Sequence, residues 1–120
     1  AVSCTGASNC FAVGASSTGN TSTLVERWNG TSWTIVTSPN PTGASSSGLA
    51  GISCIAATSC FAVGNTDIGG SRSLIEQWNG TNWSVAAATA PPSLNGVACI
   101  SATSCYAVGG YFNTLIERYA

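Results

Sequence analysis

The sequence predicts an all-β protein built from repeated units, because one cysteine-containing segment occurs three times with β-prone runs and turn residues after it. The segment Cys4-x5-Cys10-Phe11-Ala12-Val13-Gly14 returns at residues 54–64 and, with tyrosine in place of phenylalanine, at residues 99–109. A period of this size is typical of propeller blades or solenoid turns, in which one unit cannot bury its apolar face alone. The chain therefore has to be interpreted as an array.

Each unit contains four short strand signals. In the second unit they are the runs at residues 51–54, 60–64, 74–78 and 83–86. The second run is small and apolar, which suits a strand buried on both faces. Asn79-Gly80 separates the last two runs, and such a step between β-prone runs is the strongest short hairpin signal. We expect a β-propeller-type array of four-stranded antiparallel blades, about three in number, with the last incomplete.

The last hairpin of each unit is rich in tryptophan. Strand alternation places Leu74, Glu76 and Trp78 on one face, with Trp83 and Val85 on the same face of the pairing strand. We expect these aromatic residues to pack between units, with ligand stacking as the alternative. The complete set of packing aromatics is Trp28, Trp33, Trp78, Trp83 and Tyr119.

One acidic residue recurs in the third strand of every unit, as Glu26, Glu76 and Glu117. A catalytic role would not need the same acid in each unit. We expect these residues to cap backbone amides of a neighbouring strand or to pair with Arg27 or Arg118.

The connections between the strand signals vary, as loops do. Residues 15–23 and 65–73 are interpreted as inserted loops, and residues 110–114 as a shorter bridge. Pro- and Ser-rich stretches at residues 38–48 and 90–93 separate the units. A single repeat domain, 1–120, is therefore expected, with blades at 1–47, 48–93 and 94–120.

The order of these parts resembles a kelch-type β-propeller blade: a strand ending in Val108-Gly109-Gly110, a variable loop, an apolar-Glu-aromatic strand, an Asn-Gly-type turn and a tryptophan. The Cys-x5-Cys motif and the sequence ERWNGTSW at residues 26–33 are similar to repeats of large secreted bacterial propeller-like proteins. The resemblance covers essentially the whole chain, although the double glycine is complete only in the third unit. It implies a scaffold and not a reaction.

The six cysteines form three short-range pairs, one in each unit. Two cysteines that flank a tight loop can face each other across a hairpin and close a disulfide ring. Disulfides imply an oxidising compartment, and free buried thiols are the alternative. A zinc site is disfavoured because the chain has no histidine and the spacing is not Cys-x2-Cys. The expected pairs are Cys4 with Cys10, Cys54 with Cys60, and Cys99 with Cys105.

The composition restricts the function classes. Only 6% of the residues are charged and the net charge is -1, which gives no basic footprint for nucleic acid. No apolar run is long enough for a membrane span, and no signal peptide is expected because residues 1–4 already lie inside a repeat. The chain has neither histidine nor lysine, so we expect no catalysis, no metal and no cofactor. Asp67 and Arg72 are interpreted as a solvated loop pair, with a polar-ligand site as the alternative.

Four Asn-x-Ser/Thr sequons occur, at Asn20, Asn29, Asn79 and Asn82. Asn29 and Asn79 are explained by the turns they occupy. Asn20 is the best candidate for a glycan if the exporting cell modifies such sites.

Propellers usually have four to eight blades, so apolar faces would remain exposed at both ends of this array. We predict a non-catalytic, secreted or cell-surface structural and interaction module that self-associates through its blade faces, as a subunit of a ring or a filament. One alternative is a carbohydrate-binding propeller, in which exposed tryptophans or Tyr111-Phe112 stack on a sugar ring. The other is a fragment of a larger secreted propeller enzyme.

Overall fold

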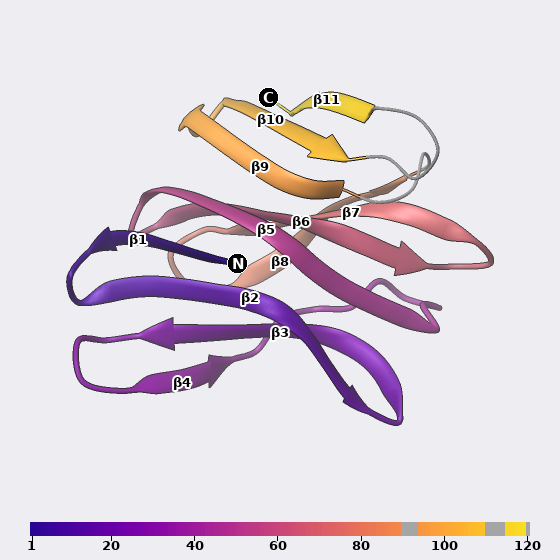
Figure 1. Ribbon diagram of the computed structural model, residues 1–120, viewed down its shortest axis with the longest axis horizontal. Coiled ribbons are helices and arrows are strands. Elements are labelled where there is room, and N and C mark those ends of the chain that lie inside the picture. Colours follow the sequence, from indigo (N-terminus) through magenta and orange to yellow (C-terminus); the bar gives the residue numbers. More distant parts are fainter. Residues whose placement is uncertain (90–93, 110–114, 120) are drawn as a thin grey trace.

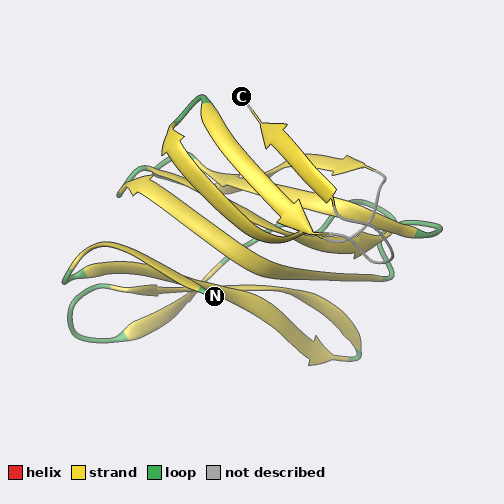
Figure 2. Ribbon diagram, turned by 45° about the horizontal axis from the view of Figure 1, so that its top comes forward, coloured by secondary structure: helices red, strands yellow, loops and turns green. Residues whose placement is uncertain are grey.

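Antiparallel strands make up most of the protein (Figures 1 and 2). The computed structural model describes residues 1–89, 94–109 and 115–119, and of β11 only the backbone. The connection at residues 90–93, the bridge at 110–114 with Tyr111 and Phe112, and the side chain of Tyr119 therefore lie outside the described residues. No helix occurs within those ranges, so they contain none that is long and apolar enough to cross a membrane.

The strands form three sheets, and in each sheet the strands follow one another in chain order. The first sheet contains β1 (Val2–Gly6), β2 (Asn9–Thr18), β3 (Asn20–Trp28) and β4 (Trp33–Val36). The second contains β5 (Ser46–Ala56), β6 (Ser59–Asp67), β7 (Ser71–Trp78) and β8 (Trp83–Thr89). The third contains β9 (Leu94–Ser101), β10 (Ser104–Gly109) and β11 (Leu115–Tyr119). The predicted all-β class is confirmed, as are antiparallel sheets with three disulfides, while the sheets of the described residues do not close into a ring.

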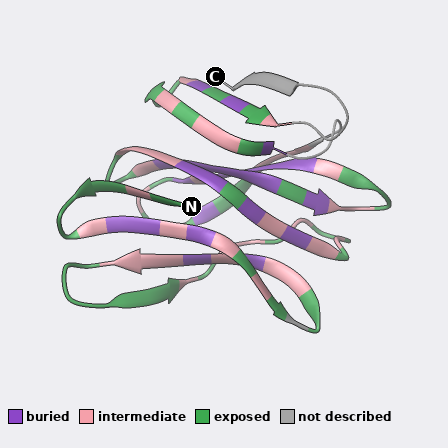
Figure 3. Cartoon of the chain, in the orientation of Figure 1, coloured by how far each residue is buried: buried purple, intermediate pink, exposed green. Residues whose placement is uncertain are grey.

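The three sheets are stacked as layers, with the second sheet in the middle (Figure 1). Strand β5 lies at the centre of this stack, since it contacts β1, β2 and β3 on one side and β9 on the other. The strands of the middle sheet carry the most buried residues (Figure 3). Two apolar clusters fill the spaces between the layers, one between the first and second sheets and one between the second and third.

Close approach of the inner strands requires glycine at one position. A methyl group on Gly51 would lie 2.9 Å from the Cα of Gly96 in the neighbouring sheet. Such a distance is too short for two carbon atoms, so any side chain here would push β5 and β9 apart. The two glycines occupy the same position in their repeats, three residues before the first cysteine.

The interpretation of residues 15–23 and 65–73 as loops is wrong for most of their length, because both segments are paired strands joined by short turns at Gly19 and at residues 68–70. The β2–β3 ladder continues through Ala15 opposite Thr23 to Thr18 opposite Asn20. The β6–β7 ladder continues through Asn65 opposite Ser73 to Asp67 opposite Ser71. These segments are polar, so they lack the alternation of apolar and polar residues by which a strand is predicted. Buried pairs of hydroxyl groups take the place of the apolar side chains of an ordinary strand. Thr66 and Ser47, for example, share a hydrogen bond of 2.8 Å.

The hairpins expected at the Asn-Gly steps are present, but each turn has four residues. Trp28 pairs with Trp33 across the first hairpin, so residues 29–32 form the loop. The Asn29 side-chain oxygen accepts hydrogen bonds from the backbone N–H groups of Thr31 and Ser32, at 2.9 Å each. Gly30 has a φ of 98°, which favours glycine. The second unit repeats this turn at residues 79–82.

Candidate interaction faces

Each sheet presents two chemically different faces, because successive side chains of a strand point to opposite sides. Ile52, Trp78 and Trp83 of the second sheet point toward the first sheet. We call this face, and the equivalent face of the other sheets, the tryptophan face. The opposite face carries the aromatic residue and the valine that follow the second cysteine of each unit, and we call it the phenyl face. Its members are Phe11 and Val13 in the first sheet, Phe61 and Val63 in the second, and Tyr106 and Val108 in the third.

The contact between the first two sheets is an aromatic cluster. The Phe11 ring of the first sheet lies 5.2 Å from the Trp78 ring and 5.6 Å from the Trp83 ring. The guanidinium of Arg27 stands over Phe11 at 5.2 Å and over Trp78 at 5.7 Å. Such distances are those of edge-to-face and cation–π contacts, which add to the gain from burial. Trp78 and Trp83 therefore lie packed against the first sheet.

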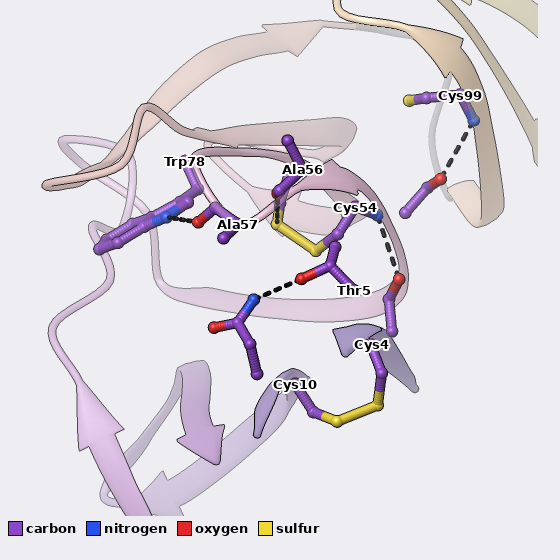
Figure 4. The surroundings of a disulfide bond; sticks show 12 residues. Cys4, Thr5, Cys10, Cys54, Ala56, Ala57, Trp78 and Cys99 are labelled. Carbon is purple, nitrogen blue, oxygen red and sulfur yellow. Dashed lines mark hydrogen bonds between the residues drawn. A yellow bond between two sulfur atoms is a disulfide. The ribbon is translucent and has the colours of Figure 1, made fainter. Parts of the chain in front are cut away.

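A second feature that joins neighbouring sheets is a pair of equivalent hydrogen bonds between inner strands (Figure 4). The Cys54 N–H donates to Ser3 Oγ at 3.1 Å. One unit further on, the Cys99 N–H donates to Ser53 Oγ at the same distance. These serines are not among the residues predicted from the sequence, although both directly precede the first cysteine of a unit. The equivalent residue of the third unit is Ala98, which has no acceptor to offer.

The disulfides lie on the tryptophan faces. Cys4–Cys10, Cys54–Cys60 and Cys99–Cys105 each join the first two strands of a sheet, between residues directly opposite each other. Figure 4 shows the first two of these bonds beside the inter-sheet hydrogen bonds. No cysteine is free. Three disulfides in a domain this small are typical of extracellular proteins.

Glu76 does not have the role expected from the sequence. Its side chain is fully buried between the first two sheets, and neither carboxyl oxygen has a hydrogen-bond partner. Arg27 of the first sheet, which stands over the Trp78 ring, donates instead to the side-chain oxygen of Asn9. Burial away from water raises the pKa of Glu76 from 4.5 to about 8. Backbone capping and ion pairing are therefore both wrong for this residue.

Two faces of the stack are not covered by another sheet, and their side chains are correspondingly exposed. On the tryptophan face of the first sheet, Trp33 is 44% exposed, whereas the equivalent Trp83 is 5% exposed. On the phenyl face of the third sheet, Tyr106 is 47% exposed, whereas the equivalent Phe11 is fully buried. Residues of one kind are thus buried or exposed according to whether a neighbouring sheet covers them.

More apolar side chains share this exposure. On the tryptophan face of the first sheet they are Val2 and Ile35, and on the phenyl face of the third sheet Val108. Trp28 is half-buried and stacks on Trp33, with ring centroids 5.7 Å apart. On the uncovered tryptophan face, Trp33 and Ile35 of β4 and the adjacent Trp28 therefore form an apolar group beside Glu26, rather than isolated exposed residues.

The remaining predicted site residues lie away from these faces. Asp67 accepts a hydrogen bond from the Gly70 N–H at 3.0 Å, and the Arg72 side chain donates to the Ile68 carbonyl at 3.4 Å. Both therefore stabilise the β6–β7 turn. The four sequon asparagines, Asn20, Asn29, Asn79 and Asn82, are all exposed. The described residues contain no group of three or more side chains suited to hold a metal ion.

A comparison with models of known protein families gives no match, and a comparison with curated proteins gives none either.

Proposed function

We propose that the chain is a non-catalytic extracellular module of propeller type that self-associates through the uncovered faces of its first and third sheets. The observation that carries this proposal is the contrast between equivalent residues: Trp83 is buried where a sheet covers it and Trp33 is exposed where none does. Covering such a surface with a further sheet removes apolar area from water, at about 25 cal/mol per Å². The few charges of the chain offer little repulsion against such contacts.

The test is the native mass of the non-reduced chain, measured by light scattering from about 10 μM to about 1 mM. We expect the mass to rise with concentration toward a ring or a filament, and electron microscopy of the same sample distinguishes the two. The double variant Trp33→Asp/Ile35→Asp should weaken association about 30-fold or more, the effect of losing one interface hot spot. A chain that stays monomeric over the whole range contradicts the proposal.

A matched control lies on the same strand. Thr34 is exposed and stands between the two substituted residues, but its side chain points to the opposite side of β4. Thr34→Asp adds charge at the same place in the fold without touching the tryptophan face. We expect it to leave the association unchanged, and all variants are checked for three intact disulfides and an unchanged circular dichroism spectrum.

Carbohydrate binding is the second candidate, and the exposed Trp28–Trp33 ring pair supports it. Aromatic rings on an exposed surface stack on the apolar face of a sugar. The probe is titration with cellohexaose or chitohexaose, followed by tryptophan fluorescence. Saturable quenching that Trp33→Ala abolishes would favour this function over self-association.

A further inference from the structure

We infer that copies of the chain dock in one direction only: the phenyl face of the third sheet of one copy seats on the tryptophan face of the first sheet of the next copy. This inference rests on the self-association proposed above and names the two surfaces and their order. The partner is a second copy of this chain, because the chain itself already contains the contact in question twice.

The two internal contacts have the same polarity. The phenyl face of the first sheet packs on the second sheet, where Phe11, Val13 and Val25 meet Trp78 and Trp83. The phenyl face of the second sheet packs on the third in turn, where Phe61 and Val63 meet Cys105 and Ala107. No contact between described sheets joins two like faces. The stack therefore leaves one face of each kind uncovered, and a second copy supplies the complement of each.

The uncovered phenyl face also repeats the chemistry of the first internal contact. Phe11 lies opposite Arg27 in the β2–β3 ladder, and both side chains contact the Trp78 ring. In the third sheet Tyr106 lies opposite Arg118 in the β10–β11 ladder. The second sheet has Gln77 in this position. The third sheet thus places an aromatic residue and an arginine in the register that receives a tryptophan pair, and Trp28–Trp33 is the uncovered pair.

Charge disfavours the arrangement in which two tryptophan faces meet. Glu26 lies on the tryptophan face, in register with Ala12 and Ile35. Two tryptophan faces related by a two-fold axis would bury two such carboxylates in one interface. Docking of unlike faces brings only one Glu26 into each interface, so this like-charge juxtaposition is avoided.

The inter-sheet hydrogen bond of the internal contacts has no counterpart in this docking. Ser3 and Ser53 each accept a backbone N–H from the next sheet, but the third sheet has Ala98 at this position, opposite Tyr106. The Cys4 N–H of the incoming copy would therefore meet a methyl group. Ala98→Ser should supply the acceptor and strengthen docking about fivefold, since a net hydrogen bond contributes about 1 kcal/mol.

The direction is tested with two variants, each blocked on one face. Trp33→Asp/Ile35→Asp blocks the tryptophan face, and Tyr106→Asp blocks the phenyl face. We expect neither variant to associate by itself, and an equimolar mixture to form a 1:1 heterodimer through the two intact faces. The mixture is measured up to about 1 mM, because a single contact lacks the effective concentration of a closed ring.

The outcomes separate the two proposals. If the unmodified chain never associates, self-association itself is refuted. If the unmodified chain associates and either blocked variant still dimerises alone, like faces meet and the directional inference fails. A mixture that stays monomeric at every concentration also overturns it. Ala98→Ser gives an independent reading, with Ala102→Ser, in the exposed β9–β10 turn, as the control that should leave the affinity unchanged.

Discussion

At the scale of single residues, Glu76 shows that equivalent positions of the repeat can differ strongly in their exposure to water. Its equivalent Glu26 is only half-buried on an uncovered face, whereas Glu76 has no exposed area and no hydrogen-bond partner. A buried carboxyl group without a partner is far more stable when it is neutral. The covering sheet, and not the sequence around the residue, causes this difference.

The free energy of unfolding should therefore depend on pH through Glu76. Its pKa is raised to about 8 in the folded protein, so the folded state binds a proton that the unfolded state releases between about pH 4.5 and 8. Stability from this group is full below pH 4.5 and falls as the pH rises, by at most about 1.4 kcal/mol per pH unit. Glu76→Gln should flatten this slope and be most stabilising near pH 8. Denaturant unfolding of both proteins across this range measures the effect, and parallel pH profiles would contradict it.

At the scale of elements, each disulfide closes the hairpin formed by the first two strands of a sheet, whereas the tryptophan hairpins are formed by the last two strands of the first and second sheets. Reduction should therefore loosen β1–β2, β5–β6 and β9–β10 while the tryptophan hairpins persist. The double substitution Cys54→Ser/Cys60→Ser should lower stability by about 2 kcal/mol, as the chain-entropy estimate gives for a loop this short. Hydrogen exchange with and without reductant locates the change, and unchanged melting after complete reduction would contradict the expectation.

The order of strands within a unit could be predicted from the sequence, because the repeat aligns β-prone runs with turn residues. The extent of the strands could not. Residues 15–23 are rich in Ser, Thr and Gly, and nothing local shows that Thr23 is buried by Ser38 and Asn40. Burial of this kind is decided by a segment more than ten residues away in the chain.

The candidate faces show a similar limit. Alternation correctly places Trp78 and Trp83 on one face of their hairpin, since these residues are directly paired. It contains no information on which neighbouring sheet covers that face. The insertion of Phe11 between these rings, and the hydrogen bonds to Ser3 and Ser53, are inter-sheet contacts. Such contacts depend on how the sheets stack, which the pattern within one strand does not determine. The residue before the first cysteine is nevertheless serine in the first two units and alanine in the third.

At the scale of the whole molecule, directional docking would bury one further acidic side chain for each contact formed. Docking gives Glu26 the position that Glu76 has between the first two sheets. In that position Glu76 is fully buried and neither of its carboxyl oxygens has a hydrogen-bond partner. Burial of a charged group without a partner costs free energy, so Glu26 should weaken each contact.

Glu26→Gln should accordingly associate more tightly than the unmodified chain, because a neutral amide costs less to bury than a carboxylate. Sedimentation of both proteins over a series of concentrations measures the two association constants. Glu76→Gln is the matched control, because Glu76 is already buried before docking and its replacement should leave the association constant unchanged. An association constant that Glu26→Gln does not change would mean that Glu26 stays solvated in the assembly, and that the faces meet in another geometry.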